Sequence, residues 1–167
     1  MKTFQPFIIA TIVLAFIGFR AIAGENEKAS PLDPIKALAG KWEEQPTDGS
    51  PASVVEFKVT SAGGSVVETM FPGQPHEMVN VYTVDGESII VTHYCASKNA
   101  PRMRLTKNEN GAMLFEFIDG ANITPEKSYM GKLELIIGTD EIEEKWTSIT
   151  DGKEEGQMAF KMKRVKD

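Results

Sequence analysis

Nothing in this chain predicts its fold more clearly than ETMFPGQPHEMVNVYTVDGESIIVTHYCASKNAPRM, which runs from Glu68 to Met103. Apolar and polar residues alternate on both sides of Asp85-Gly86. An aspartate followed by glycine between alternating runs predicts a tight two-residue turn, because glycine accepts the positive φ that this turn requires. We therefore predict a β-hairpin with strands near residues 77–84 and 87–95.

A turn at Asp85-Gly86 also predicts which side chains share a face of the hairpin, since opposed residues point the same way. Met78 would then oppose His93. One face would carry His76, Met78, Asn80, Tyr82, Ile89, Val91, His93 and Cys95. The other would carry Glu77, Val79, Val81, Thr83, Ser88, Ile90, Thr92 and Tyr94. A three-residue loop would shift the pairing by one residue, and either face could line an interior.

The same alternation extends outward from the hairpin in both directions. Short runs between turn residues predict strands near 41–45, 53–60, 65–71, 77–84, 87–95, 101–107, 112–118, 129–137, 141–149 and 156–165. Asp33-Pro34 predicts the start of a short helix that ends near Gly40. Such even spacing is typical of an antiparallel meander, and closing it removes exposed edges. We predict an all-β domain over 33–167, an antiparallel up-and-down β-barrel of about ten strands with a short N-terminal helix.

Residues 1–23 have the pattern of a signal peptide. Lys2 precedes an apolar run from Phe7 to Phe19, and small residues at Ala21 and Ala23 precede the expected cleavage before Gly24. The run is short for a membrane span. We therefore expect an exported protein, periplasmic or extracellular and free of the membrane after cleavage, in which 24–32 form a flexible lead-in to the barrel.

Charge excludes several classes of partner. Removing the first 23 residues takes away Lys2 and Arg20 but no acidic residue, which leaves 16 basic and 24 acidic residues. Nucleic acids and anionic membrane surfaces attract clustered basic residues, so neither is an expected partner. A small-molecule ligand is expected instead. The acidic run from Asp140 to Glu144 is interpreted as a solvated strand edge.

Gly40-Lys41-Trp42, directly after the short helix, resembles the Gly-x-Trp signature of the calycin superfamily, which includes lipocalins and fatty-acid-binding proteins. The pieces ETMFPG (68–73), HEM (76–78), HYC (93–95) and PRM (101–103) are similar to exported bacterial lipocalin-like proteins of unassigned function. The resemblance implies a ligand-binding barrel in which Trp42 packs under Arg164 as a structural cap. It implies no established reaction.

The candidate ligand-binding residues gather in and around the hairpin. They are Glu68, His76, Met78, Tyr82, His93, Tyr94 and Arg102. An arginine near the mouth of a barrel can clamp a carboxylate with two hydrogen bonds, which would make the ligand anionic. The alternatives for Arg102 are a surface position or an ion pair with Glu68.

A metal or haem site is a second interpretation of the same residues. His76, His93 and Cys95 are soft or borderline ligands, although their spacing matches no standard metal motif. Cys95 is the only cysteine, so it cannot form an intramolecular disulfide and is a buried filler, a reactive thiol or a ligand.

Three functions stay open at this point. The leading hypothesis is a binding module that holds a small, largely apolar ligand, with no catalytic residue assigned. The alternative is a redox or enzymatic site on His76, His93 and Cys95, using a metal, haem or the thiol. The third is a barrel filled by its own side chains that acts as an interaction module. The cofactor and the oligomeric state are not defined by the sequence.

Overall fold

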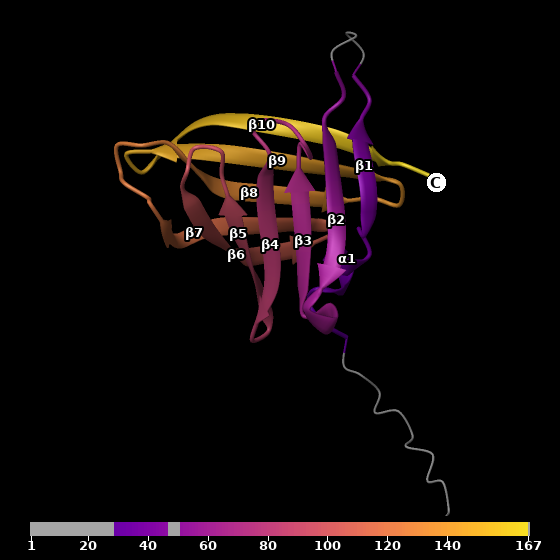
Figure 1. The fold of residues 1–167 in the computed structure, drawn as a ribbon. Helices are drawn as coiled ribbons and strands as arrows, with labels where there is room; N and C mark the ends of the chain where they lie inside the picture. The colour runs from indigo at the N-terminus through magenta and orange to yellow at the C-terminus, as the bar shows by residue number, and fades with distance from the viewer. Residues whose placement is uncertain (1–28, 47–50, 167) are drawn as a thin grey trace, which may run out of the picture.

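The computed structural model describes residues 29–46 and 51–166, and within these parts ten strands close into one antiparallel β-barrel. Each strand pairs with the next in the sequence, and the last pairs with the first (Figure 1). The strands are β1 (Gly40–Glu44), β2 (Val54–Thr60), β3 (Ser65–Met70), β4 (Met78–Asp85), β5 (Ser88–Tyr94), β6 (Ala100–Glu109), β7 (Ala112–Ala121), β8 (Tyr129–Ile137), β9 (Glu141–Thr150) and β10 (Lys153–Arg164). This confirms the all-β, ten-stranded barrel predicted from the alternation.

The helical elements are short. They are α1 (Asp33–Lys36) and the 3₁₀ turn η1 (Ser61–Gly63). The signal peptide, most of the lead-in and the expected turn at 48–50 lie outside the described residues. In Figure 1, β2 to β5 run roughly up and down, and β7 to β10 cross behind them, as expected when a strongly twisted sheet closes on itself.

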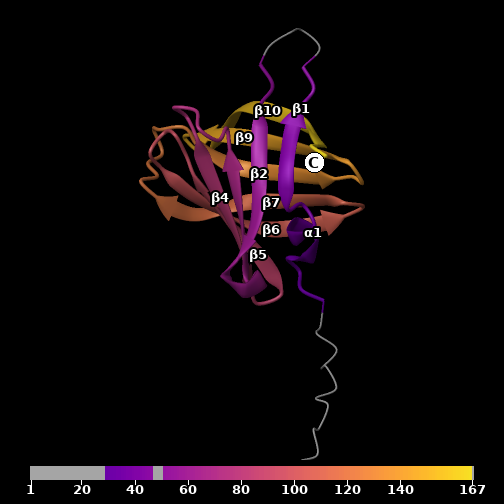
Figure 2. The ribbon, with the colours of Figure 1, turned by 45° about the vertical axis from the view of Figure 1, so that its right-hand side comes forward.

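One end of the barrel, which we call the helix end, is covered by α1. Leu32, Ile35 and Leu38 are buried there against the barrel, and Figure 2 shows α1 beside the start of β1. Trp42 is fully buried and its indole N–H donates to the carbonyl of Leu38 at 2.8 Å. These contacts make the helix end an apolar plug.

Arg164 holds this plug in place. Its guanidinium lies 4.2 Å from the centroid of the Trp42 ring and donates to the carbonyls of Ala37 and Ala39 at 2.8 and 2.9 Å. Gly40 has a φ of +122°, and a Cβ there would lie 3.3 Å from the arginine. The glycine is therefore required both by its backbone conformation and by the close approach of Arg164.

The β4–β5 hairpin forms as predicted, but its register differs. The turn residues are Gly86 and Glu87, so the predicted turn at Asp85-Gly86 is wrong by one residue. Asn80 pairs with His93, so the predicted pairing of Met78 with His93 is also wrong. Gly86, with a φ of +64°, occupies the first central position, where type II′ turns prefer glycine. A shift of two residues along the pair keeps every side chain on its predicted face.

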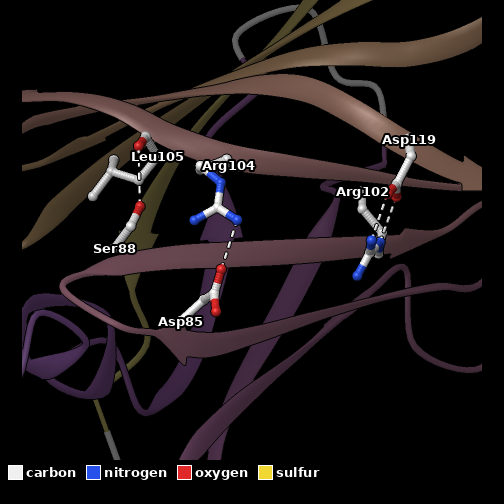
Figure 3. A network of polar contacts seen from close by, with 6 residues as sticks. All are labelled: Asp85, Ser88, Arg102, Arg104, Leu105 and Asp119. Atoms are coloured by element: carbon white, nitrogen blue, oxygen red, sulfur yellow. Dashed lines mark hydrogen bonds and ion pairs between the residues drawn. The ribbon is translucent and has the colours of Figure 1, made fainter.

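Asp85 stays in the β-ladder opposite Ser88, and its carboxylate has a partner on the outside of the barrel. Arg104 on β6 donates to it at 2.6 Å, and Arg102 on the same strand forms a bidentate pair with Asp119 on β7 (Figure 3). The Ser88 hydroxyl donates to the carbonyl of Leu105. Exposed contacts like these contribute little stability individually. Together they connect β4, β5 and β7 to β6 on the outer face.

Candidate functional site

Polar side chains cluster inside the barrel, where apolar packing would be the rule. Glu68, Asn80 and His93 lie opposite one another on β3, β4 and β5, and each is at most 1% exposed. Tyr82 on β4 and Glu144 on β9 are also fully buried. The hairpin face that carries Asn80, Tyr82 and His93 therefore lines the interior. The sequence alone could not decide which of the two hairpin faces does so.

Hydrogen bonds connect these side chains in one chain. The Tyr82 hydroxyl donates to Glu68 Oε2 at 2.7 Å, and Asn80 Nδ2 donates to the same oxygen at 2.9 Å. Because the Asn80 amide nitrogen is used in this way, its Oδ1 is free to accept. His93 Nδ1 lies 2.7 Å from this Oδ1, so the nitrogen must carry the proton and donate.

The two buried carboxyl groups cannot both be charged. Burial raises the pKa of Glu68, although hydrogen bonds from Tyr82 and Asn80 oppose this. Burial, followed by the charge of Glu68, raises the pKa of Glu144 well above its usual range. The interaction between the two carboxyls lowers the pKa of Glu68 and raises the pKa of Glu144, while Glu68 Oε1 and Glu144 Oε1 have no other hydrogen-bond partner. The arrangement is that of a protonated Glu144 donating to a Glu68 carboxylate, like other carboxyl pairs that share a proton.

His93 is held as a neutral imidazole with a fixed tautomer. Burial lowers its pKa to about 4. Its Nδ1 donates to Asn80, so its Nε2 carries a lone pair, and this buried atom has no hydrogen-bond partner in the structure. The ring packs against Trp146 of β9 with centroids 4.8 Å apart, and the Trp146 indole donates to Glu144 Oε2 at 3.0 Å. Glu68 Oε1, Glu144 Oε1 and Asn99 Oδ1 are also buried without a partner, but His93 Nε2 is the one neutral imidazole acceptor among these atoms, and unpaired buried atoms of this kind call for an explanation.

The barrel is less completely covered at the end opposite α1, which we call the open end. Strand direction alternates, so the connections 71–77, 95–99, 122–128 and 151–152 meet there. Along β10, the inward-facing Met162 is 1% exposed, Phe160 is half-buried and Met158 is 48% exposed. Met158 pairs directly with Trp146, which itself lies against His93. Met158 is therefore the most exposed of these inward-facing residues of β10, and it lies one cross-strand pair away from the buried network.

The structure brings some of the predicted ligand-binding residues together and separates others. Glu68, Tyr82 and His93 belong to the buried network, and Met78 is half-buried on the same inner face. The remaining predicted residues, His76, Tyr94 and Arg102, are exposed. His76 lies in the 71–77 connection, where it packs on Phe71.

Arg102 is not an internal anion clamp in this arrangement. Its side chain lies on the outer face of β6, and both of its donor groups that form hydrogen bonds are directed at Asp119 (Figure 3). It is a surface arginine with a partner other than Glu68. The inner face of the same strand is occupied at the neighbouring position by the buried Met103.

The weak metal candidates are not gathered into one ligand set. His93 is buried, Cys95 is half-buried after β5, and His76 is exposed in another connection. Within 29–46 and 51–166, no group of three or more His, Cys, Asp and Glu side chains has the geometry to hold a metal ion.

Three members of the network, Asn80, Glu144 and Trp146, were missed as site residues. Asn80 was placed on the correct face but assigned no role. The interpretation of the acidic run as a solvated edge is wrong for Glu144, which is fully buried beside Trp146. The signal was present, because Ile142, Glu144 and Trp146 alternate at the period of a strand whose inner face includes Glu144.

The geometry defines a closed ten-stranded barrel with an internal carboxyl, amide, phenol and imidazole network. No family model matches this chain, and no match is found among curated proteins. In the described parts of the chain, no helix combines the length and apolar character needed to cross a membrane.

Proposed function

We propose that this protein is an exported, calycin-like β-barrel that binds a small, largely apolar molecule at its open end. The observation that carries the proposal is the unpartnered Nε2 of His93, a buried acceptor held in one orientation by Asn80. Burying a polar atom without a partner costs about 1–3 kcal/mol, and a bound donor would remove this cost. Buried polar groups of this kind are common where a site is prepared for a ligand.

The apolar surroundings support the same function. Exposed Met158 pairs with Trp146, which packs on His93, and half-buried Phe160 and Met78 also lie on the inner face of the barrel. Methionine adapts its shape to different ligands, because its side chain is unbranched and flexible. An apolar wall with one oriented polar group is the usual composition of a small-molecule site.

Export is supported by the sequence of residues 1–23. The mature protein recovered from its own host should begin at Gly24, which N-terminal sequencing or intact mass would establish. Retention of the apolar run from Phe7 to Phe19 in the mature chain would contradict this part of the proposal.

Ligand binding at the open end is tested with a neutral, environment-sensitive dye that has no hydrogen-bond donor, 6-propionyl-2-dimethylaminonaphthalene. Its fluorescence should rise on addition of the protein. Met158→Lys should weaken dye binding by about tenfold or more, because it replaces an apolar side chain of the proposed site by an ammonium group that is costly to desolvate. The matched control is Val84→Lys, since Val84 is 40% exposed at the helix end. Absence of dye binding, or equal effects of the two variants, would contradict the proposal.

A further inference from the structure

In the parts of the chain that the structure describes, the barrel interior contains hydrogen-bond acceptors and the carboxyl groups of Glu68 and Glu144, but no cationic side chain near this buried network. Among the described residues, the buried polar and charged side chains are Glu68, Asn80, His93, Asn99, Glu144 and Thr147, without any lysine or arginine. The inward guanidinium of Arg164 is used at the helix end by Trp42 and two carbonyls. Arg102 is directed outward to Asp119. A carboxylate ligand would therefore enter an interior without a compensating charge.

The carboxyl pair makes an anion still less favourable. Glu68 accepts hydrogen bonds from Tyr82 and Asn80, whereas Glu144 accepts only one, from Trp146, which is the arrangement expected when Glu68 is the charged member. Electrostatic repulsion is strong in a poorly solvated interior, because few water dipoles screen it. The field of the pair thus selects against ligands with negative charge.

His93 specifies the polar group that the ligand should have. Its Nδ1–H is committed to Asn80, so the ring offers one lone pair at Nε2 and no further donor. A ligand that carries one O–H or N–H can satisfy this atom, whereas a ligand with only acceptors cannot. The ring lies beside Trp146, and Met158 lies opposite Trp146 on the next strand. Thioether and aromatic surfaces of this kind pack well against a flat ring.

We propose that the preferred ligands are neutral aromatic alcohols, whose hydroxyl donates to Nε2 of His93 while the ring packs near Trp146 and Met158. This inference rests on the proposed binding function and adds the class of ligand. The hydroxyl of a phenol is a strong donor, and its ring supplies apolar contact without adding charge. Nε2 of His93 then favours ligands that carry a hydrogen-bond donor, and the negative charge of the interior disfavours anionic ligands.

Three probes of similar size separate donor, acceptor and charge: 4-propylphenol, 4-propylanisole and 4-propylbenzoate. Their affinities are measured by displacement of the naphthalene dye and by titration calorimetry at neutral pH. The phenol should bind about tenfold more tightly than the anisole, since only the phenol satisfies the buried acceptor. The benzoate should bind most weakly.

His93→Phe keeps a ring beside Trp146 but removes the acceptor, so it should abolish the difference between phenol and anisole. The matched control is His76→Phe, which changes the exposed histidine and should retain the tenfold difference. Should His93→Phe fail to fold, ¹⁵N NMR of the unmodified protein decides. The phenol should shift the Nε2 resonance of His93 more than its Nδ1 resonance, and the anisole should not.

The outcomes separate the two proposals. Dye binding with equal phenol and anisole affinities would leave the binding barrel standing and overturn the assignment of the ligand class. Tightest binding of the benzoate would overturn it as well, and so would a Soret absorption band in protein from its own host, because iron would then occupy Nε2. Failure of the dye and all three probes to bind would overturn both proposals.

Discussion

Replacing Glu144 by glutamine should stabilise the protein at neutral and alkaline pH. Glutamine has nearly the shape of a protonated glutamate, so it can donate to Glu68 and still accept from the Trp146 indole. The wild-type side chain must hold a proton in the folded protein that it releases in the unfolded chain, because its folded pKa is raised well above 4.5. The variant has no such proton to hold.

The direction of this pH dependence follows from the raised pKa of Glu144. The stability contributed by a protonated Glu144 is complete below pH 4.5 and is lost as the pH rises towards its folded pKa. Across that window, the wild type should lose a little over 1 kcal/mol per pH unit relative to Glu144→Gln. At pH 7 the difference in unfolding free energy has a ceiling of roughly 3 kcal/mol, reduced by the cost of burying an amide.

Urea unfolding, followed by far-ultraviolet circular dichroism between pH 5 and 9, measures this difference directly. Glu143→Gln is the matched control, since its half-buried side chain lies on the outer face of the same strand. Glu68→Gln should be less stable than Glu144→Gln at pH 7, because it replaces the charged acceptor of Tyr82 and Asn80 by a neutral one. Parallel pH profiles for wild type and Glu144→Gln, or the reverse order of the two network variants, would refute the reasoning.

Three further predictions concern the cap, the hairpin and His93. Arg164→Ala should lower the unfolding free energy by about 1–3 kcal/mol in urea titrations, because two carbonyls and the Trp42 ring lose their partner; an unchanged midpoint would contradict this. Gly86→Val should lower the unfolding free energy by about 1–3 kcal/mol, because Gly86 has a φ of +64° that strains a branched side chain. No atom of the described residues would clash with a Cβ at this position, so the whole cost is backbone strain. In NMR titrations from pH 8 to 3, His93 should protonate only near pH 4, and protonation near pH 6.5 would show that it is not buried as described.

The fold was predictable because its determinants are local. Alternation and turn residues define ten strands, and their observed bounds differ from the predicted ones by at most three residues at each end. The hairpin register was less predictable, because Gly86 is compatible with either central position of a two-residue turn. In the structure Asp85 remains in the ladder opposite Ser88, and its carboxylate pairs with Arg104 on β6.

The site was predictable only in part, because half of it depends on contacts across the barrel. Glu68, Tyr82 and His93 could be selected from adjacent strands, where the period of two places them on one face. Glu144 could not be matched with Glu68, since the two are far apart in sequence and meet only after closure. Arg102 was predicted to clamp a carboxylate near the mouth of the barrel, with a surface position as an alternative, and its position between buried Pro101 and Met103 is the outward one.

The retention of polar side chains inside an otherwise apolar barrel has a cost, and the geometry indicates what offsets it. Each member of the network either donates to or accepts from the next, so the charge of Glu68 fixes the orientation of Asn80, and Asn80 fixes the tautomer of His93. A network that served stability alone would be expected to satisfy its last member too, because an unpaired buried atom costs free energy. Nε2 of His93 is unpaired instead, and so are Glu68 Oε1 and Glu144 Oε1. Under the proposed function, a bound ligand that donates to Nε2 of His93 would offset part of this cost.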